Sequence, residues 1–203
     1  MRSALLPTVA AVLLLTAACT AGPTPSGAAT TAIPLTPCPT GLRCGAHLVD
    51  GLGARKAQVL AAGATTAELA VAMLESETLT ADYPAGDGKT GDAANAGIFK
   101  QNWLMLRTAC AAFAGRGADQ WADGAVLDAD LAADVTCLHE SEAFYGPDAW
   151  FAGHRGGAAG LATPGTADIE RYRTAVGWIT QQLDADPANL GNDVRFWVDV
   201  PAI

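Results

Sequence analysis

The clearest pattern in this chain of 203 residues is a helical stripe of large apolar side chains near its C-terminal end. Its members recur at intervals of three and four residues: Ile169, Tyr172, Val176, Ile179 and Leu183. This spacing places them on one face of an α-helix, and Thr166 precedes them as an N-cap residue. Because such a face must be buried against other elements, the stripe predicts a packed helical domain.

Three further segments carry helical signals. Thr65 and Glu68 form a capping box, with the Glu three residues after the Thr, and predict a helix that begins there. Its apolar face consists of Leu69, Ala70, Met73 and Leu74. A second helix is expected over residues 100–113, and a third after Asp128, which acts as its N-cap. The third helix turns three apolar residues inward: Leu131, Val135 and Leu138.

The segment 80–96 breaks the helical pattern. Pro and Gly residues at positions 84, 86, 88 and 91 are scattered among Asp and Asn residues, which favours a loop or a small β-hairpin. Near the end of the chain, residues 196–198 predict a short strand. We therefore expect a mainly α domain of the α+β class with a small β-hairpin.

The first 18 residues are typical of an export signal. A basic start is followed by an apolar run over residues 5–18, which is shorter than the roughly 20 residues that cross a membrane. Small residues before Cys19 resemble a bacterial lipoprotein cleavage site, after which Cys19 would carry lipid and make the only membrane contact. An ordinary secretory signal, cut a few residues later, is the alternative, because Thr16 stands where an aliphatic residue is usual. Both alternatives predict an exported protein, at the cell surface or outside the cell.

Residues 19–37 are almost all Thr, Ala, Pro, Gly and Ser, which is typical of a flexible linker, so the folded domain is expected over residues 38–203. Beside Cys19 the chain has four cysteines: Cys38, Cys44, Cys110 and Cys137. In an exported protein they are expected to form disulfides. Of the three possible pairings, we favour Cys38–Cys44 with Cys110–Cys137, because the second bond would join two predicted helices.

Charge and motifs exclude several kinds of function. The net charge of −9 argues against nucleic-acid binding, which needs clusters of Lys and Arg, and favours a neutral substrate over an anionic wall polymer. No Gly-x-Ser-x-Gly motif is present, and the cysteines are expected to be bonded or lipidated, so neither a serine nor a thiol nucleophile is expected. Residues 88–90 imitate the end of a phosphate-binding loop, but Tyr83 replaces its first Gly. Metal-ligand spacings are missing as well, and we expect neither a metal nor a cofactor.

The remaining chemistry is that of carboxyl groups around a Gly-rich hairpin. Hydrolysis of a glycosidic bond needs one protonated acid and one ionised carboxylate. The candidates are Glu75, Glu77, Asp82, Asp87 and Asp92. An acid at a helix end beside apolar side chains is expected to have its pKa raised by burial, whereas an Asp in a solvated hairpin stays charged. For any single acid, a solvated surface position is the alternative.

Three short segments resemble parts of known glycosidases, in the order in which those folds use them. Residues 74–80 resemble the segment around the catalytic Glu of animal-type lysozymes, and residues 97–102 resemble the strand end that follows the lysozyme hairpin. Residues 150–156 are similar to a Gly-containing turn of lytic transglycosylases. The resemblance implies a lysozyme-like helical domain whose small hairpin carries part of the active site.

A longer resemblance, from about Leu69 to Ile203, is to glycoside hydrolase family 134. It is carried by the run Asp82–Asn95 and by the motif Gly97–Trp103 that follows. The family comprises β-1,4-mannanases of fungi and actinobacteria that have a lysozyme-like fold and act with inversion. The resemblance implies β-1,4-mannan or manno-oligosaccharides as the substrate. It places the family's general acid on Glu75 and its general base on Asp87.

Two details bear on the choice of carboxyl groups. Animal-type lysozymes carry their second carboxylate at the position of Asn95, so the ionised partner must lie elsewhere, and Asp87 fits an inverting geometry. For the acid, periodicity alone favours Glu77, because it continues the apolar stripe of the preceding helix. Motif matching favours Glu75, which we adopt.

Sugar binding needs flat apolar faces and fixed polar groups. The candidates for stacking on a sugar ring are Tyr83, Trp103 and Trp150, with core packing as the alternative for Trp103. The candidates for bonding hydroxyl groups are Lys89, Asp92, Asn95, Gln101, Asn102, His154 and Arg155. Lys89 and Asp92 could instead pair across the hairpin, whereas His154 and Arg155 share a Gly-rich turn that we expect to lie at the cleft.

Together these features predict a monomeric, secreted or cell-surface endo-β-1,4-mannanase that hydrolyses internal bonds with inversion. Two alternatives remain. One is a peptidoglycan hydrolase or lytic transglycosylase on the same fold. The other is a non-catalytic carbohydrate-binding lipoprotein.

Overall fold

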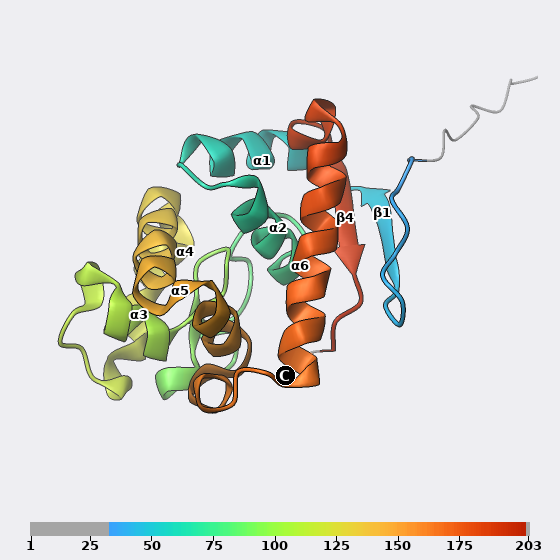
Figure 1. Ribbon diagram of the computed structural model, residues 1–203. Coiled ribbons are helices and arrows are strands. Elements are labelled where there is room, and N and C mark those ends of the chain that lie inside the picture. Colours follow the sequence, from blue (N-terminus) through green and yellow to red (C-terminus); the bar gives the residue numbers. More distant parts are fainter. Residues whose placement is uncertain (1–32, 202–203) are drawn as a thin grey trace, which may run out of the picture. The chain divides into compact units, whose positions relative to one another are not determined.

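The computed structural model describes residues 33–201 (Figure 1). The predicted export signal, the lipid-bearing Cys19 and the first part of the linker lie outside the described residues. Within residues 33–201, no helix combines the length and the apolar character that spanning a membrane requires.

Helices dominate the described part of the chain, which confirms the expected mainly α class. In chain order the elements are β1 (Cys44–Leu48), α1 (Leu52–Ala61), α2 (Thr66–Glu75), β2 (Asn95–Ala96), β3 (Gln101–Asn102), α3 (Trp103–Ala109), α4 (Val126–Ala129), α5 (Leu131–Ala162), α6 (Ala167–Ala185) and β4 (Val194–Val198). Short 3-10 turns occupy Gly91–Ala93, Ala111–Phe113, Ala118–Ala125 and Pro187–Leu190. Both small sheets are antiparallel: β1 pairs with β4, and β2 pairs with β3, where Asn95 lies opposite Asn102.

The main core forms between α2 and α6, which lie side by side with β4 against α6 (Figure 1). The predicted capping box is present, since the Thr65 hydroxyl accepts from the Glu68 amide and the Glu68 carboxylate accepts from the Thr65 amide. Helix α2 is buried on all sides over residues 68–73, as expected of a central helix. All five members of the predicted stripe on α6 are buried, which confirms that prediction.

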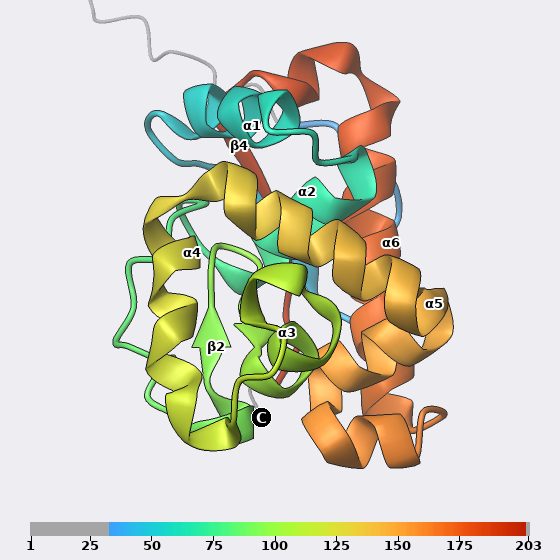
Figure 2. The ribbon, with the colours of Figure 1, turned by 90° about the vertical axis from the view of Figure 1, so that its left-hand side faces the viewer.

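A second, smaller core surrounds Trp103 at the start of α3. Figure 2 shows α3 beside α5. The Trp103 ring meets Phe113 edge to face, with ring centroids 5.2 Å apart, and its Nε1 donates to the Gly117 carbonyl. The Cys110–Cys137 disulfide joins the end of α3 to α5 beside this core. Ala94 and Ala96 belong to this small core, which therefore supports β2. The segment 80–96, predicted as a loop or small hairpin, is mostly loop with one antiparallel bridge between Gly86 and Asn95, and the hairpin of β2 and β3 lies at its end and beyond it.

Several helix boundaries differ from the predictions. The expected helix over residues 100–113 is α3 with a 3-10 turn after it. Helix α5 is capped by Asp130, whose carboxylate accepts from the Ala133 amide, and not by Asp128. The carboxylate of Asp128 accepts instead from the Gly97 amide, at 2.8 Å. Helix α1 and strand β1 were not predicted. The sequence of α1 shows no clear apolar stripe at helical spacing, and that of β1 shows no clear alternation of apolar and polar residues.

The predicted Gly-rich turn around His154 is wrong, because residues 150–156 lie within α5. The helix is interrupted at Gly146 (φ 71°) and again at Gly157 (φ 55°), and Pro147 opens the helical stretch between them. A Pro is well tolerated at the first position of a helix, because the backbone N–H that it lacks would have no intrahelical acceptor there. His154 and Arg155 are therefore presented from a rigid helix and not from a loop.

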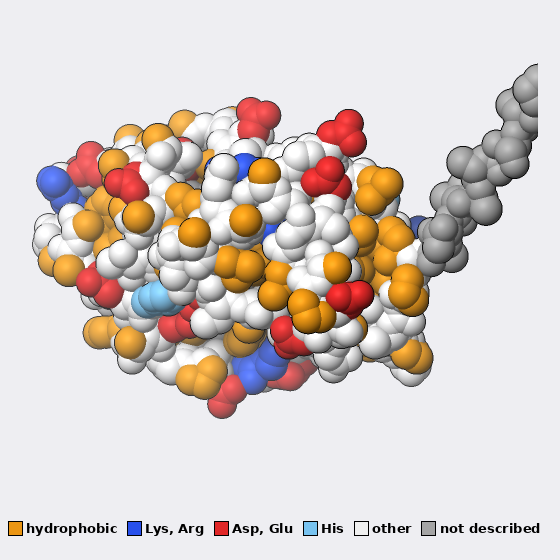
Figure 3. Space-filling view, turned by 90° about the horizontal axis from the view of Figure 1, so that it is seen from above, with side chains coloured by type: hydrophobic (Ala, Val, Ile, Leu, Met, Phe, Trp, Pro, Cys, Tyr) orange, Lys and Arg blue, Asp and Glu red, His pale blue; other side chains and the backbone are white. Residues whose placement is uncertain are grey.

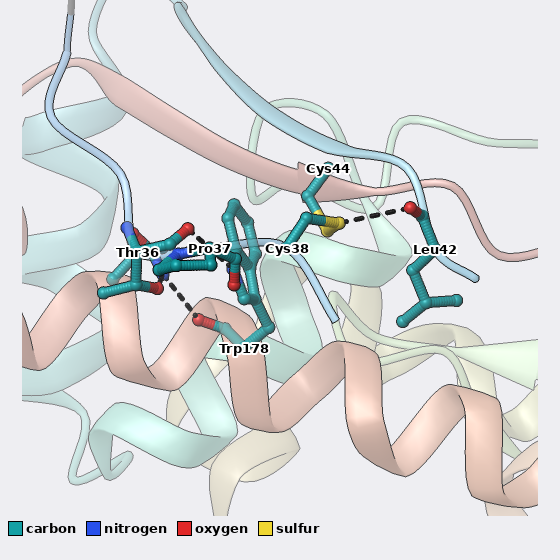
Figure 4. The surroundings of a disulfide bond; sticks show 7 residues. Thr36, Pro37, Cys38, Leu42, Cys44 and Trp178 are labelled. Atoms are coloured by element: carbon teal, nitrogen blue, oxygen red, sulfur yellow. Dashed lines mark hydrogen bonds between the residues drawn. A yellow bond between two sulfur atoms is a disulfide. The ribbon is translucent and has the colours of Figure 1, made fainter. Parts of the chain in front are cut away.

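The folded unit begins at Ile33, so residues 33–37 of the predicted linker belong to it. Ile33 packs against the main core, and the Thr36 amide donates to the Gln182 side chain on α6. Trp178, also on α6, donates from Nε1 to the Pro37 carbonyl at 3.1 Å (Figure 4). The Cys38–Cys44 disulfide follows directly and anchors this segment to β1. Both disulfides have the pairing that we favoured, and they suggest an extracellular environment.

Candidate active site

A cleft of about 390 Å³ brings together the end of α2, the segment 87–95, the start of β3 and the middle of α5. Its lining residues are Glu75, Asp87, Lys89, Asp92, Ala93, Asn95, Lys100, Asn102, His154, Arg155, Gly156, Gly157 and Ala158. The two carboxyl groups assigned by motif, Glu75 and Asp87, therefore line one cavity although they come from different elements.

Glu75 is the last residue of α2. The backbone turns extended at Ser76 (φ −137°, ψ 148°), which ends the helix and directs the Glu75 side chain into the cleft. The side chain is 20% exposed. Its Oε1 accepts a hydrogen bond of 2.6 Å from the Tyr172 hydroxyl and lies 3.5 Å from Nε2 of His154.

The electrostatics of Glu75 differ from the expectation. Burial raises the pKa of the Glu75 carboxyl, but hydrogen bonding and the charge of His154 lower it, and so do the Tyr172 hydroxyl and the charge of Lys100. The balance leaves the pKa below its ordinary value, whereas the sequence predicted a raised one. The prediction considered the apolar helix and missed the donors on α5 and α6.

Glu77, which periodicity favoured, lies outside the cleft. Its side chain is 57% exposed, lies within hydrogen-bond distance of Nε2 of His47, at 2.6 Å, and forms an ion pair with Arg195 at 3.1 Å. Because α2 ends at Glu75, the helical spacing does not extend to Glu77, and the periodicity argument fails at this point.

Asp87 occupies a turn of unusual backbone geometry. Gly86, Asp87 and Gly88 all have positive φ, of 66°, 58° and 72°. Asp is one of the few residues with a side chain that tolerates this region, and the flanking glycines do so freely. Oδ2 of Asp87 accepts from Nζ of Lys100 at 3.1 Å and from Nδ2 of the Asn95 side chain at 3.3 Å. Among the described residues, none donates a hydrogen bond to Oδ1, and Asp87 lines the cleft.

One buried carboxylate, that of Asp134, holds the strand end over residues 97–102. Asp134 on α5 is fully buried and accepts from the Ile98 amide at 2.7 Å and from the Gln101 side chain at 2.7 Å. Gly97 (φ 75°) lies against the same carboxylate, where a Cβ atom would collide with it. The Tyr83 hydroxyl donates to the Gly97 carbonyl at 2.6 Å. These bonds fix the positions of Lys100 and Asn95, and through them that of Asp87.

The predicted sugar-binding residues divide into two groups. Six of them line the cleft: Lys89, Asp92, Asn95, Asn102, His154 and Arg155. The other four do not: Tyr83, Gln101, Trp103 and Trp150. Of these four, the last three are buried, with 1–3% of their surface exposed, so neither Trp103 nor Trp150 offers a ring face to a sugar. Tyr83 and Gln101 support the strand end, and Trp150 packs beside His154.

Most polar groups of the cleft are already engaged with protein partners. Asp92 forms a two-bond ion pair with Arg107, at 2.6 and 2.8 Å, so the alternative pairing with Lys89 is wrong. Arg155 binds Asp168 in the same manner, at 2.7 and 3.1 Å. The Asn102 side chain caps α3 and donates to the Gly153 carbonyl. These contacts orient the polar groups before a ligand arrives.

Two residues of the site were missed in the sequence. Lys100, in the left-handed region (φ 49°), bonds Asp87, and its Nζ lies 5.0 Å from the centre of the Tyr83 ring. It stands inside the motif Gly97–Trp103, which could have drawn attention to it. Tyr172 was assigned to the core stripe. Its hydroxyl is the one polar group in that stripe, and a buried tyrosine hydroxyl usually has a hydrogen-bond partner, so this group could have indicated a contact.

Among the described residues, one group of side chains has the spacing of metal ligands: Cys110, Cys137 and Glu140. The two sulfur atoms are bonded to each other, so this group offers no thiolate.

The family model of glycosyl hydrolase family 134 matches residues 53–200. That range includes every residue of the cleft described above. No curated protein sequence matches the chain.

Proposed function

This chain belongs to glycosyl hydrolase family 134 and is a glycoside hydrolase, and from that premise we propose that it is an inverting endo-β-1,4-mannanase. Its substrate would be β-1,4-mannan or manno-oligosaccharides, cut at internal bonds. The observation that carries the proposal is that Glu75 and Asp87 line one cleft with unlike hydrogen-bond partners.

In the proposed reaction, Glu75 gives a proton to the glycosidic oxygen as the bond to the anomeric carbon breaks. Asp87 takes a proton from a water molecule, through the Oδ1 that lacks a protein donor, while that water attacks the opposite face of the sugar. The ion pair with Lys100 keeps Asp87 in its turn and occupies Oδ2. The product then carries the inverted anomeric configuration.

Substrate binding would depend on hydrogen bonds more than on stacking. Among residues 33–201, no Trp, Tyr or Phe lines the cleft, whereas lysine, arginine, asparagine and carboxylate groups do. Sugar hydroxyls are both donors and acceptors, so they fit such a mixed set. Figure 3 shows one face of the molecule, on which acidic, basic and hydrophobic side chains are interspersed.

The proposal is tested by incubating the protein with mannan, glucomannan, chitosan and peptidoglycan side by side. We expect soluble manno-oligosaccharides from mannan and no clearing of peptidoglycan. The Glu75→Gln variant serves as the control that links product release to the cleft. Clearing of cell walls without manno-oligosaccharides would favour a peptidoglycan hydrolase, and binding of mannan without turnover would favour a non-catalytic lipoprotein.

A further inference from the structure

Three aromatic side chains from two helices meet behind Glu75. Tyr172 on α6 donates its hydroxyl to Glu75 at 2.6 Å, and Nε2 of His154 on α5 lies 2.9 Å from the same hydroxyl. The Trp150 ring stacks on the His154 ring, with centroids 4.7 Å apart and planes 9° from parallel. Tyr172, Trp150 and the His154 side chain are 1%, 2% and 3% exposed, so water does not compete for these bonds.

The distances define a chain of two hydrogen bonds. A phenol has one proton to donate. When Tyr172 gives it to Oε1 of Glu75, Nε2 of His154 must carry a proton and donate to the Tyr172 oxygen. The same heavy-atom positions also suit the reverse arrangement, in which protonated Glu75 donates to Tyr172 and Tyr172 donates to a bare Nε2. The two arrangements differ only in proton positions.

We propose that His154 and Tyr172 form a proton relay to Glu75, an inference that rests on the proposed role of Glu75 as general acid. In the empty cleft the proton resides on the His154 imidazolium and Glu75 is ionised. Nε2 then gives its proton to the Tyr172 oxygen while the Tyr172 hydroxyl proton passes to Oε1. This leaves a neutral imidazole and a protonated Glu75, with no net change in proton number. After turnover the pair regains one proton from solvent, and Asp87 releases the one taken from water.

The surrounding charges fit this direction of transfer. Three charged residues line the cleft beside Glu75 and His154: Lys100 from the segment before β3, Asp87 from its turn, and Arg155 on α5. The guanidinium carbon of Arg155 lies 5.6 Å from the centre of the Tyr172 ring. In the empty cleft, the cations favour an ionised Glu75. A sugar that displaces water strengthens the effect of burial, which favours the neutral carboxyl. Burial, and then the Glu75 charge, raises the pKa of Tyr172 well above its ordinary value, so the phenol passes a proton on without ionising.

The direct test follows the carboxyl carbon of Glu75 by ¹³C NMR in the free protein as pH is varied. We expect His154→Gln to move the Glu75 titration to higher pH, because the imidazolium is lost while burial remains. In wild type, the Glu75 signal should report two steps, as expected of a carboxyl group that shares a proton with a neighbour. His139→Gln is the matched control, since His139 lies on the same helix but bonds Glu68, and it should leave Glu75 unchanged. An unchanged Glu75 titration in His154→Gln would overturn the proposal.

Kinetics on mannan supply the second readout. Tyr172→Phe keeps the ring in the core and breaks the relay, and we expect it to lower kcat by about a hundredfold with little change in KM. His154→Gln should lower kcat and also move the alkaline limb of the pH profile to lower pH, because Glu75 alone then holds the proton that the relay shares. A purely structural role predicts equal losses at every pH, which would contradict the relay. If the wild-type protein hydrolyses no mannan at any pH, the proposed function fails, whereas the NMR titration still decides whether the pair shares a proton.

Discussion

Single residues in the cleft differ most clearly in the groups that donate to them. Glu75 is largely buried and accepts from a phenol beside an imidazole. Asp87, 24% exposed, accepts from an ammonium and an amide in a tight turn. Two carboxyl groups in such unlike surroundings are suited to the separate tasks of acid and base.

Replacement of Glu75 tests the assignment of the acid. Glu75→Gln keeps the shape and the hydrogen bond from Tyr172 but cannot give a proton, so we expect kcat on mannan to fall by about 10²–10⁴-fold or more. Affinity for manno-oligosaccharides, measured by calorimetry, should remain close to wild type. Glu77→Gln is the matched control, because that side chain lies outside the cleft, and it should retain turnover. The reverse result would transfer the acid role to Glu77.

Replacement of Asp87 tests the base. Asp87→Asn leaves water without a proton acceptor, and we expect a loss of kcat of similar size, about 10²–10⁴-fold. Asp82→Asn provides the comparison, since Asp82 is exposed on the same loop and does not line the cleft. Initial rates of reducing-sugar release measure both variants. Equal activity of wild type and Asp87→Asn would leave the base unidentified.

Local sequence motifs pointed to the two carboxyl groups that we propose as catalytic, but not to the groups that surround them. Glu75 and Asp87 could be assigned because both lie in segments that resemble those of known glycosidases. Tyr172 and His154 contact Glu75 although they are distant from it in the sequence, and a local sequence pattern cannot predict such a contact. Trp103 and Trp150 illustrate the converse, because a Trp in the core and a Trp on a sugar have the same local signature.

Among the secondary-structure elements, the strand end over residues 97–102 depends on a buried carboxyl group of α5. Burial raises the pKa of Asp134 to about 7, although bonds from the Gln101 side chain and the Ile98 amide oppose the shift. The folded state therefore binds a proton more tightly than the unfolded state. Stability contributed by this group is greatest below its ordinary pKa of 3.8 and is lost as pH rises toward about 7.

We expect Asp134→Asn to flatten this dependence. Chemical unfolding at several pH values between 4 and 7 should show that the wild-type free energy of unfolding falls more steeply with pH than that of the variant. The variant should also be less stable overall, because an amide cannot accept every donor that faces Asp134. Identical slopes in the two proteins would show that Asp134 does not titrate in this range.

The two disulfides constrain chain segments of different length. The Cys110–Cys137 bond spans 27 residues, and loop-closure entropy gives it a contribution of about 3.5 kcal/mol to the free energy of unfolding. The Cys38–Cys44 bond spans 6 residues, and the same relation gives about 2 kcal/mol. Double Cys→Ala variants of each pair, unfolded in urea, should differ in this order. A larger loss from the shorter loop would contradict an entropic origin.

Elements with strong local signals were predicted well, and the others were not. The Thr65–Glu68 capping box predicted where α2 begins, and the apolar stripe predicted which face of α6 is buried. The helical stretch that contains His154 was taken for a turn, because Gly residues surround it and the breaks at Gly146 and Gly157 depend on the tertiary fold. Helix α1 is short and carries a buried Lys56, which obscured its apolar face.

At the scale of the whole molecule, the cleft exists because three distant parts of the chain converge on α2. The hairpin is fastened to α5 through Asp134, and α5 is joined to α6 at the Glu75 side chain through His154 and Tyr172. A resemblance to a family predicted that Glu75 and Asp87 would face one cavity. Without that resemblance, the spacing of residues within each helix could not have predicted which helices pack together when about a hundred residues separate them.

The central claim is that one water molecule, activated by Asp87, attacks the sugar opposite the bond that Glu75 protonates. Proton NMR of the first products of β-1,4-mannan hydrolysis tests it most directly, if spectra are recorded before the anomers equilibrate. The account predicts that new reducing ends appear first as the α-anomer. The β-anomer as the initial product would contradict it.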